Sequence, residues 1–130
     1  MNRDGALCYL LKNNQVLLAL IHYGPGDEKW NGISGYIEIG EDPKQGIIRE
    51  IQEEIGVTVN EEDLKEAGII KVNPELKLHV FRTNKWQGEP EPKEESLLKL
   101  NWFNFDNLPF DQMHEGDKNW LPKVLTGENI

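Results

Sequence analysis

The sequence contains very little cysteine. Cys8 is the single cysteine among 130 residues, so an intrachain disulfide is excluded. A chain without disulfides suits a reducing compartment, and we expect a cytoplasmic location. Cys8 lies in an apolar run, residues 6–11, which predicts a buried and unreactive thiol. That run is too short for a signal peptide, and no stretch approaches the roughly 20 apolar residues of a membrane-spanning helix.

Positive charge is also scarce. The chain has 14 Lys and Arg against 23 Asp and Glu, which gives a formal net charge of −9. This balance argues against broad binding of nucleic acids or anionic membranes, because both require a basic surface. An acidic protein also repels polyphosphates unless cations lie between the two. The length suits one compact domain spanning residues 1–130.

The hydrophobic pattern predicts more strands than helices, with one helix interrupting the strand series. Asn13 and Asn14 mark a hairpin turn, while the Gly-rich residues 22–35 predict a long functional loop and residues 85–95 an exposed acidic one. Trp120 falls in an expected C-terminal helix. Strands are expected at residues 6–11, 16–21, 36–39, 68–72, 76–83 and 97–105. This order predicts an α/β domain with a mixed sheet.

The clearest helix begins after residue 42. Asp42 can cap it, Pro43 suits its first position, and Gly56 suits its end. One face of this helix gathers isoleucines, which we expect to be buried. They are Ile47, Ile48, Ile51 and Ile55.

Three glutamates share the adjacent face of this helix, since Glu50, Glu53 and Glu54 are spaced i, i+3 and i+4. A solvated acidic stripe is the ordinary interpretation of such a pattern. However, the like-charge pair of Glu50 and Glu54 costs roughly 0.2–0.5 kcal/mol, and it lies beside a Gly-rich loop. Clustered carboxylates at this spacing suit hard divalent cations, so the alternative is a metal site.

The segment from Gly35 to Val57 resembles the signature of the Nudix hydrolase family. The signature is Gly, five residues, Glu, seven residues, Arg-Glu, an aliphatic, any residue, Glu-Glu, any residue, Gly and an aliphatic. Every fixed position is present at this spacing. The matching residues are Gly35, Glu41, Arg49, Glu50, Ile51, Glu53, Glu54, Gly56 and Val57.

The resemblance implies an α/β/α sandwich with a mixed central sheet, and roles for the signature residues. Glu50, Glu53 and Glu54 would be ligands of Mg²⁺, for which Mn²⁺ can substitute, and Gly35 would add a backbone carbonyl. Glu53 would also orient or deprotonate the attacking water. Arg49 would pair with Glu53 and hold it in place.

Two further acidic positions follow from the same resemblance. Glu41 would brace the turn between loop and helix, through Arg49. The family often adds a glutamate from a later loop, for which Glu94 and Glu95 are the candidates. We place Glu95 in the expected ligand set, against the alternative of a solvated acidic loop.

Outside the signature, the chain resembles the MutT-like branch that hydrolyses oxidised purine nucleoside triphosphates, including 8-oxo-dGTP diphosphatase. By this likeness Asn31 would hydrogen-bond a purine base and Trp120 would line its pocket, against the alternatives of a turn residue and a core residue. The similar stretches are residues 30–32, 79–81, 102–103, 108–110 and 120–122.

The likeness is incomplete around the expected base pocket. His114 stands where vertebrate members have a tryptophan, and Gly116 and Asp117 stand where they have two aspartates. We therefore expect His114 and Asp117 to contact the base, with altered selectivity. His22 and Tyr23 could face substrate from the preceding loop, although ordinary surface positions are the simpler interpretation.

Three functions remain open at this stage. The first is a nucleoside triphosphate pyrophosphatase that releases a monophosphate and pyrophosphate. The second has the same chemistry on ADP-ribose or a nucleotide sugar. The third is a non-catalytic nucleotide-binding module, against which the complete set of signature glutamates argues. The sequence leaves the oligomeric state open.

Overall fold

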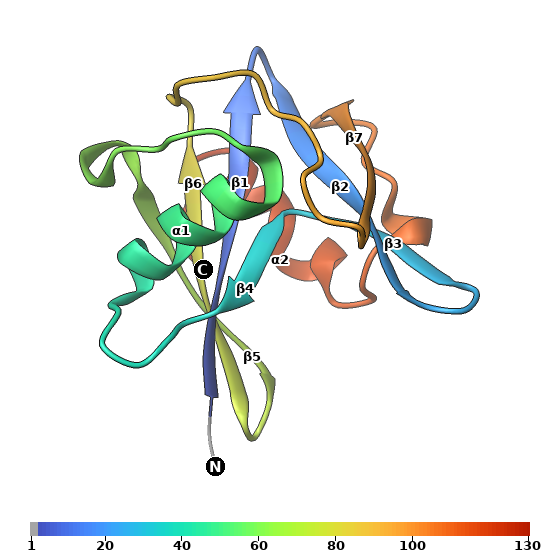
Figure 1. Cartoon of the computed structure of the whole chain (residues 1–130). Coiled ribbons are helices and arrows are strands. Elements are labelled where there is room, and N and C mark those ends of the chain that lie inside the picture. Colours follow the sequence, from blue (N-terminus) through green and yellow to red (C-terminus); the bar gives the residue numbers. More distant parts are fainter. Residues whose placement is uncertain (1–2) are drawn as a thin grey trace.

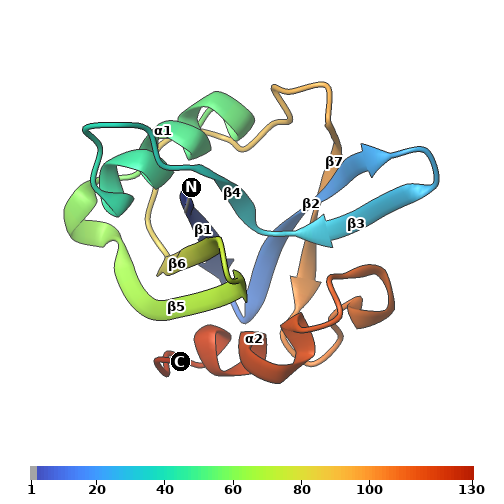
Figure 2. The same cartoon turned by 90° about the horizontal axis from the view of Figure 1, so that it is seen from below.

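The computed structural model describes residues 3–130, which form a mixed sheet with one helix on each side (Figures 1 and 2). Helix α1 covers one face and α2 the opposite face, as the view from below shows. The seven strands are β1 (Arg3–Lys12), β2 (Gln15–Gly24), β3 (Asp27–Asn31), β4 (Ile33–Tyr36), β5 (Lys65–Asn73), β6 (Leu76–Thr83) and β7 (Leu97–Asn104). The helices are α1 (Pro43–Ile55) and α2 (Asp117–Leu125), with short 3₁₀ turns η1 (Glu61–Asp63) and η2 (Phe110–Gln112).

The sheet divides along the long strand β1. The order is β3-β2-β1-β6-β5, and β1 pairs with β6 in parallel but with β2 and β4 antiparallel. β4 pairs with the first half of β1, whereas β2 pairs with the last residues of β1. The β2–β3 hairpin therefore lies to one side of β4 (Figure 1). β7 pairs with β2 as well. This division separates the β2–β3 hairpin from the β5–β6 hairpin.

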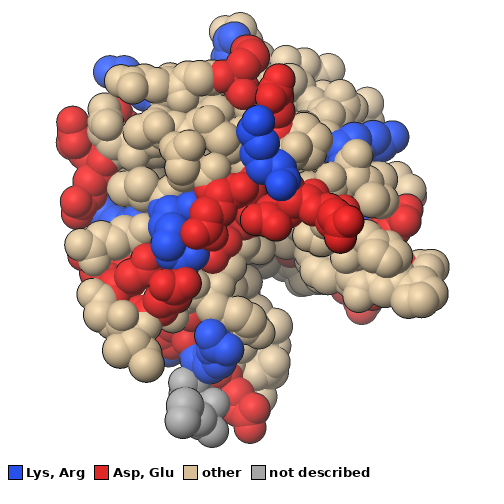
Figure 3. All heavy atoms as spheres, viewed as in Figure 1, with Lys and Arg blue, Asp and Glu red and all other residues tan. Residues whose placement is uncertain are grey.

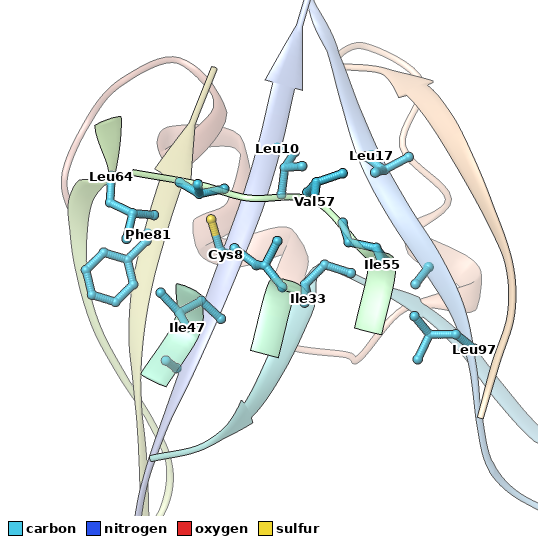
Figure 4. Close-up of a cluster of buried hydrophobic side chains, with 14 residues drawn as sticks. Cys8, Leu10, Leu17, Ile33, Ile47, Ile55, Val57, Leu64, Phe81 and Leu97 are labelled. Atoms are coloured by element: carbon cyan, nitrogen blue, oxygen red, sulfur yellow. The ribbon is translucent and has the colours of Figure 1, made fainter. Parts of the chain in front are cut away.

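Alternation along β1 produces two hydrophobic cores. Ala6, Cys8 and Leu10 face α1, whereas Leu7 and Tyr9 face α2, because successive side chains in a strand point to opposite faces. The expected isoleucines of α1 complete the first core (Figure 4). Complete burial of one such side chain contributes about 1.5–3 kcal/mol. The buried thiol of Cys8 is confirmed, and burial raises its pKa.

Helix α1 begins and ends where the sequence predicts. The Asp42 side chain accepts a hydrogen bond from the Gln45 backbone N–H at 2.9 Å, and the Gln45 side chain accepts one from the Asp42 N–H at 2.9 Å. This capping box satisfies two amides of the first turn. Gly56 adopts the left-handed conformation, φ 73°, that ends many helices.

Two expectations about secondary structure are wrong. Residues 22–35 are not one long loop, because β2 runs on to Gly24 and strands β3 and β4 follow. The strand expected at residues 36–39 is instead the end of β4 at Tyr36 and a turn, in which Ile39 is fully exposed. The other expected strands, the acidic loop and the C-terminal helix are confirmed. Within residues 3–130, neither helix is long and apolar enough to cross a membrane.

Candidate active site

Arg49, on α1, holds the turn that precedes its own helix. Its Nε donates to Glu41 Oε2 at 2.7 Å and its Nη2 donates to Glu41 Oε1 at 3.0 Å. Nη2 also donates to the backbone carbonyl of Tyr36 at 3.1 Å, and Glu41 Oε1 accepts from the Glu38 N–H at 2.9 Å. The hydrogen bond from Arg49 is the main cause that lowers the pKa of Glu41. The brace expected for Glu41 is therefore present in the structure.

The same guanidinium contacts two of the three helix glutamates. Arg49 Nη1 donates to Glu50 Oε1 at 2.8 Å and to Glu53 Oε2 at 3.2 Å. The Glu53 side chain is about half exposed at 51%, whereas that of Glu50 is 17% exposed. The Glu53 carboxylate is therefore open to solvent while Arg49 restricts its orientation.

Gly35, on β4, faces the carboxylate of Glu50. A Cβ at this position would lie 2.2 Å from Glu50 Cδ and 2.5 Å from both carboxylate oxygens. Only glycine leaves room for that carboxylate against the strand. The first glycine of the signature thus brings the β4 backbone next to a helix glutamate.

Glu54 has a buried carboxylate oxygen, Oε2, that has no hydrogen-bond partner. Burial raises the pKa of Glu54 to about 9, with contributions from the hydrogen bond and charge of Glu50 and the charges of Glu94 and Glu53. A buried carboxylate without a partner is costly unless a cation compensates it.

The loop before β7 is fixed to the end of α1. The Glu91 N–H donates to the Ile55 carbonyl at 3.0 Å and the Lys93 N–H donates to the Glu54 carbonyl at 2.8 Å. These bonds place Glu94 near Glu54, where its charge contributes to the raised pKa. Glu95, the residue that we expected as a ligand, does not act on Glu54 in this way.

This group of side chains fits a divalent cation by its chemistry. It offers carboxylate oxygens, one of which is buried and has no hydrogen-bond partner, and such oxygens suit a hard ion such as Mg²⁺. In residues 3–130, no three acidic, histidine or cysteine side chains already have a geometry that would hold a metal. Arg49 binds Glu50 and Glu53 instead, so metal binding would require these carboxylates to turn.

A cavity of about 530 Å³ lies next to this acidic group. Figure 3 shows a band of carboxylates over α1 and a hollow beneath it, between the β5–β6 and β2–β3 hairpins. Gly35 lines the cavity and also contacts Glu50, so the two features meet at β4. At the β5–β6 end the lining is largely apolar and includes Ile70, Val72, Leu76 and Leu78.

All four residues expected to contact the base line this one cavity. They are Asn31, His114, Asp117 and Trp120. Asp117 is only 6% exposed and its Oδ2 has no hydrogen-bond partner, while burial raises its pKa to about 6. Burial and the charge of Lys29 lower the pKa of His114. The Asn31 Oδ1 accepts from the Gly32 N–H at 2.8 Å, which orients the amide.

One residue that lines the cavity was not expected to do so from the sequence. Tyr23 lines the cavity, although an ordinary surface position was the simpler interpretation. His22 does not line it and pairs with Glu28 at 3.5 Å. The alternation of β2 would have found Tyr23 only if the strand had been extended past residue 21.

The chain matches the NUDIX domain over residues 1–124. The chain belongs to the Nudix family. It is therefore a hydrolase of phosphoanhydride bonds. Members of this family generally use divalent metal ions.

Among the proteins similar to this Nudix hydrolase are members of the MutT-like branch that its sequence resembles. The chain is 35% identical over 124 residues to the oxidized purine nucleoside triphosphate hydrolase of Danio rerio, which covers 92% of this chain and 77% of that protein. The protein of the same name from Mus musculus is 33% identical over the same shares. The crystal structure of a MutT NUDIX hydrolase from Burkholderia pseudomallei has the same fold, with a TM-score of 0.79, 21% identity, and coverage of 88% of this chain and 92% of that one.

Proposed function

We propose that this Nudix hydrolase cleaves purine nucleoside triphosphates, oxidised ones included, to a nucleoside monophosphate and pyrophosphate. One observation supports the substrate class above the others. Asn31 of β3 lines one cavity, beside the signature glutamates, together with three residues near the C-terminal end of the chain: His114, Asp117 and Trp120. The relatives named as oxidized purine nucleoside triphosphate hydrolases agree with this choice.

The polar end of the cavity would hold the base. The Asn31 amide and the Asp117 carboxylate can hydrogen-bond the edge of a purine, because an amide both donates and accepts and a carboxylate accepts. The unpartnered Oδ2 of Asp117 would gain a donor from the base. Trp120 supplies an aromatic wall.

The acidic group would hold the phosphates through divalent cations. We propose Glu50, Glu53 and Glu54 as metal ligands, with the Gly35 carbonyl beside them. Glu94, rather than Glu95, is proposed as the ligand from the later loop, because its charge acts on Glu54. When bound, Mg²⁺ would neutralise phosphate oxygens and lower the pKa of a coordinated water.

The protein's own groups would orient the reaction. Glu53, half exposed, would hold the attacking water and take its proton. Arg49 would keep Glu53 and Glu50 aligned, because its guanidinium is fixed by two hydrogen bonds to Glu41. Holding reactants in place in this way accounts for much of phosphoryl-transfer catalysis.

A turnover screen tests the substrate class. Wild-type protein with Mg²⁺ is supplied with normal and oxidised (d)NTPs, ADP-ribose and a nucleotide sugar, and the products are separated by chromatography. We expect a purine triphosphate to give the highest kcat/KM, with pyrophosphate as a product. Faster release of AMP from ADP-ribose than of a monophosphate from any triphosphate would select the second function.

A further inference from the structure

Tyr23 lies at an irregularity of strand β2. The register between β2 and β3 shifts between His22 and Gly24, so Tyr23 is the residue at the bulge. Bulges re-aim side chains and are common next to active sites. At this bulge the two successive side chains differ in position. Tyr23 lines the cavity, whereas His22 pairs with Glu28 outside it.

Tyr23 contacts a residue 91 positions away. Its hydroxyl and the Nε2 of His114 form a hydrogen bond of 3.1 Å, and the two rings meet edge to face with centroids 5.2 Å apart at 74°. His114 lies in the segment between η2 and α2. Among the hydrogen bonds of residues 3–130, none other joins the β2–β3 hairpin to residues 113–125. The pair is therefore the polar link between the hairpin and the start of α2.

Tyr23 and His114 each lie close to a residue that is proposed to contact the base. On the hairpin side, Asn31 is the last residue of β3, which pairs with β2, and it lines the same cavity as Tyr23. On the helix side, the Asp117 N–H donates to the His114 carbonyl at 3.0 Å. The contact of Tyr23 with His114 therefore lies between the hairpin that carries Asn31 and the segment that carries Asp117.

The hairpin also meets this part of the chain through apolar packing, because Trp30 shares a hydrophobic core with Met113 and Leu121. β3 is an edge strand that pairs with β2, and the tip of the hairpin projects from the molecule (Figure 1). Trp30 also contacts Phe103 of β7, with the ring centroids 4.9 Å apart. Beside this apolar packing, the hydrogen bond of Tyr23 with His114 adds a directional restraint between the strand that carries Asn31 and the segment that carries Asp117.

We propose that Tyr23 and His114 form a clasp that fixes the spacing of Asn31 and Asp117 and thereby determines which base the cavity accepts. This inference rests on the proposed function, because it concerns the base site of the same cavity. Tyr23 and His114 act as positioning residues: they set the width of the polar end of the cavity, and the metal chemistry lies elsewhere. Their removal should change substrate affinity and base preference but not the chemical step.

Steady-state kinetics of Tyr23→Phe, His114→Ala and the double variant test the clasp, with purine and pyrimidine dNTPs compared. Each single variant should raise KM for the preferred purine triphosphate about three- to tenfold, the size expected for one lost neutral hydrogen bond. The kcat should stay within about twofold, since binding common to ground and transition states changes KM alone. The KM ratio between pyrimidine and purine substrates should fall.

The double variant and a conservative replacement separate the clasp from a general loss of structure. The double variant should be no worse than the poorer single variant, because the two substitutions remove one interaction. His114→Gln, which keeps an acceptor near the position of Nε2, should recover part of the lost affinity. His22→Ala is the matched control, since His22 lies one residue before the bulge and outside the cavity, and it should match wild type.

Additive effects in the double variant, unchanged KM in both single variants, or parallel loss of kcat and thermal stability would overturn the clasp. A wild-type protein that cleaves no triphosphate would instead overturn the proposed function. Calorimetric titration with dGMP needs no turnover, so it tests the clasp even if the protein cleaves no triphosphate. The clasp predicts weaker dGMP binding by Tyr23→Phe than by wild type, and equal binding would contradict it.

Discussion

Arg49 and Glu41 form a two-point contact, with Nε 2.7 Å from Oε2 and Nη2 3.0 Å from Oε1. The contact joins helix α1 to the turn before it and leaves Nη1 for Glu50 and Glu53. Arginine is suited to this position because its planar fork can bind one carboxylate at two points and still donate to others.

Replacement of Arg49 by lysine should therefore reduce activity while the charge is retained. Lysine cannot form the two-point contact and cannot reach three carboxylates at once. Loss of such a supporting contact typically costs about 10–100-fold in activity or metal affinity. The measurements are kcat at saturating Mg²⁺ and the Mg²⁺ concentration for half-maximal rate. Wild-type values for both would show that Arg49 contributes charge alone.

Gly35→Ala tests the close approach of β4 to Glu50. The added Cβ would overlap the Glu50 carboxylate, which must then leave its place. We expect kcat/KM to fall about 10–100-fold with an unchanged circular dichroism spectrum. Gly24→Ala is the matched control, because no atom lies within 4 Å of a Cβ there and its activity should be that of wild type. Equal activity of both variants would remove Gly35 from the site.

Glu54→Gln should make the metal-free protein more stable at neutral and alkaline pH. Burial, and then Glu50, raise the pKa of Glu54 from 4.5 to about 9, so the folded state holds a proton that the unfolded chain releases between these values. The stability that this proton provides is complete below about pH 4.5 and is lost as the pH rises towards 9. Glutamine has no proton to lose, so the variant should gain on the order of 1–3 kcal/mol relative to wild type at pH 8.

Urea unfolding in EDTA at pH 4 and pH 8 measures this difference. The advantage of Glu54→Gln should appear at pH 8 and vanish at pH 4, and its Mg²⁺-dependent turnover should be lost. A variant that is less stable than wild type at both pH values would identify Glu54 as a structural residue.

Asp117→Asn addresses the base end of the cavity. Burial raises the pKa of Asp117 from 3.8 to about 6, so the stability contributed by its proton is lost as the pH rises through this window. Asparagine should make the protein more stable at pH 7 by about 1 kcal/mol and raise KM for purine triphosphates. Thermal unfolding at pH 4 and pH 7, together with purine dNTP kinetics, tests both effects. A normal KM would remove Asp117 from the base site.

The sequence predicted the elements whose signals are local. The capping box at Asp42, the isoleucine face of α1 and the alternation of β6 all depend on neighbours within four residues. β3 was missed because its sequence, DEKWN, is polar and follows Gly24, Pro25 and Gly26, which indicate a loop. It forms because β2 supplies a partner strand, and its last two residues are buried.

In the candidate site, too, the contacts within the signature were predicted and the contacts between distant segments were not. The contacts of Arg49 with Glu41 and Glu53 were expected from the spacing of the Nudix signature, and the structure contains both. The contact of Tyr23 with His114 could not be predicted, because it depends on a bulge and on the packing of segments 91 residues apart. The position of Glu94 near Glu54 likewise follows from loop hydrogen bonds that no motif encodes.

The central claim is that the signature glutamates cleave a purine nucleoside triphosphate to its monophosphate and pyrophosphate. Its most direct test is the Mg²⁺-dependent release of pyrophosphate from purine dNTPs, including 8-oxo-dGTP, by wild type and by Glu53→Gln at equal concentration. The account predicts stoichiometric monophosphate and pyrophosphate from wild type and a rate lower by about 100-fold or more in the folded variant. Equal rates in the two proteins, or no pyrophosphate from any triphosphate, would contradict it.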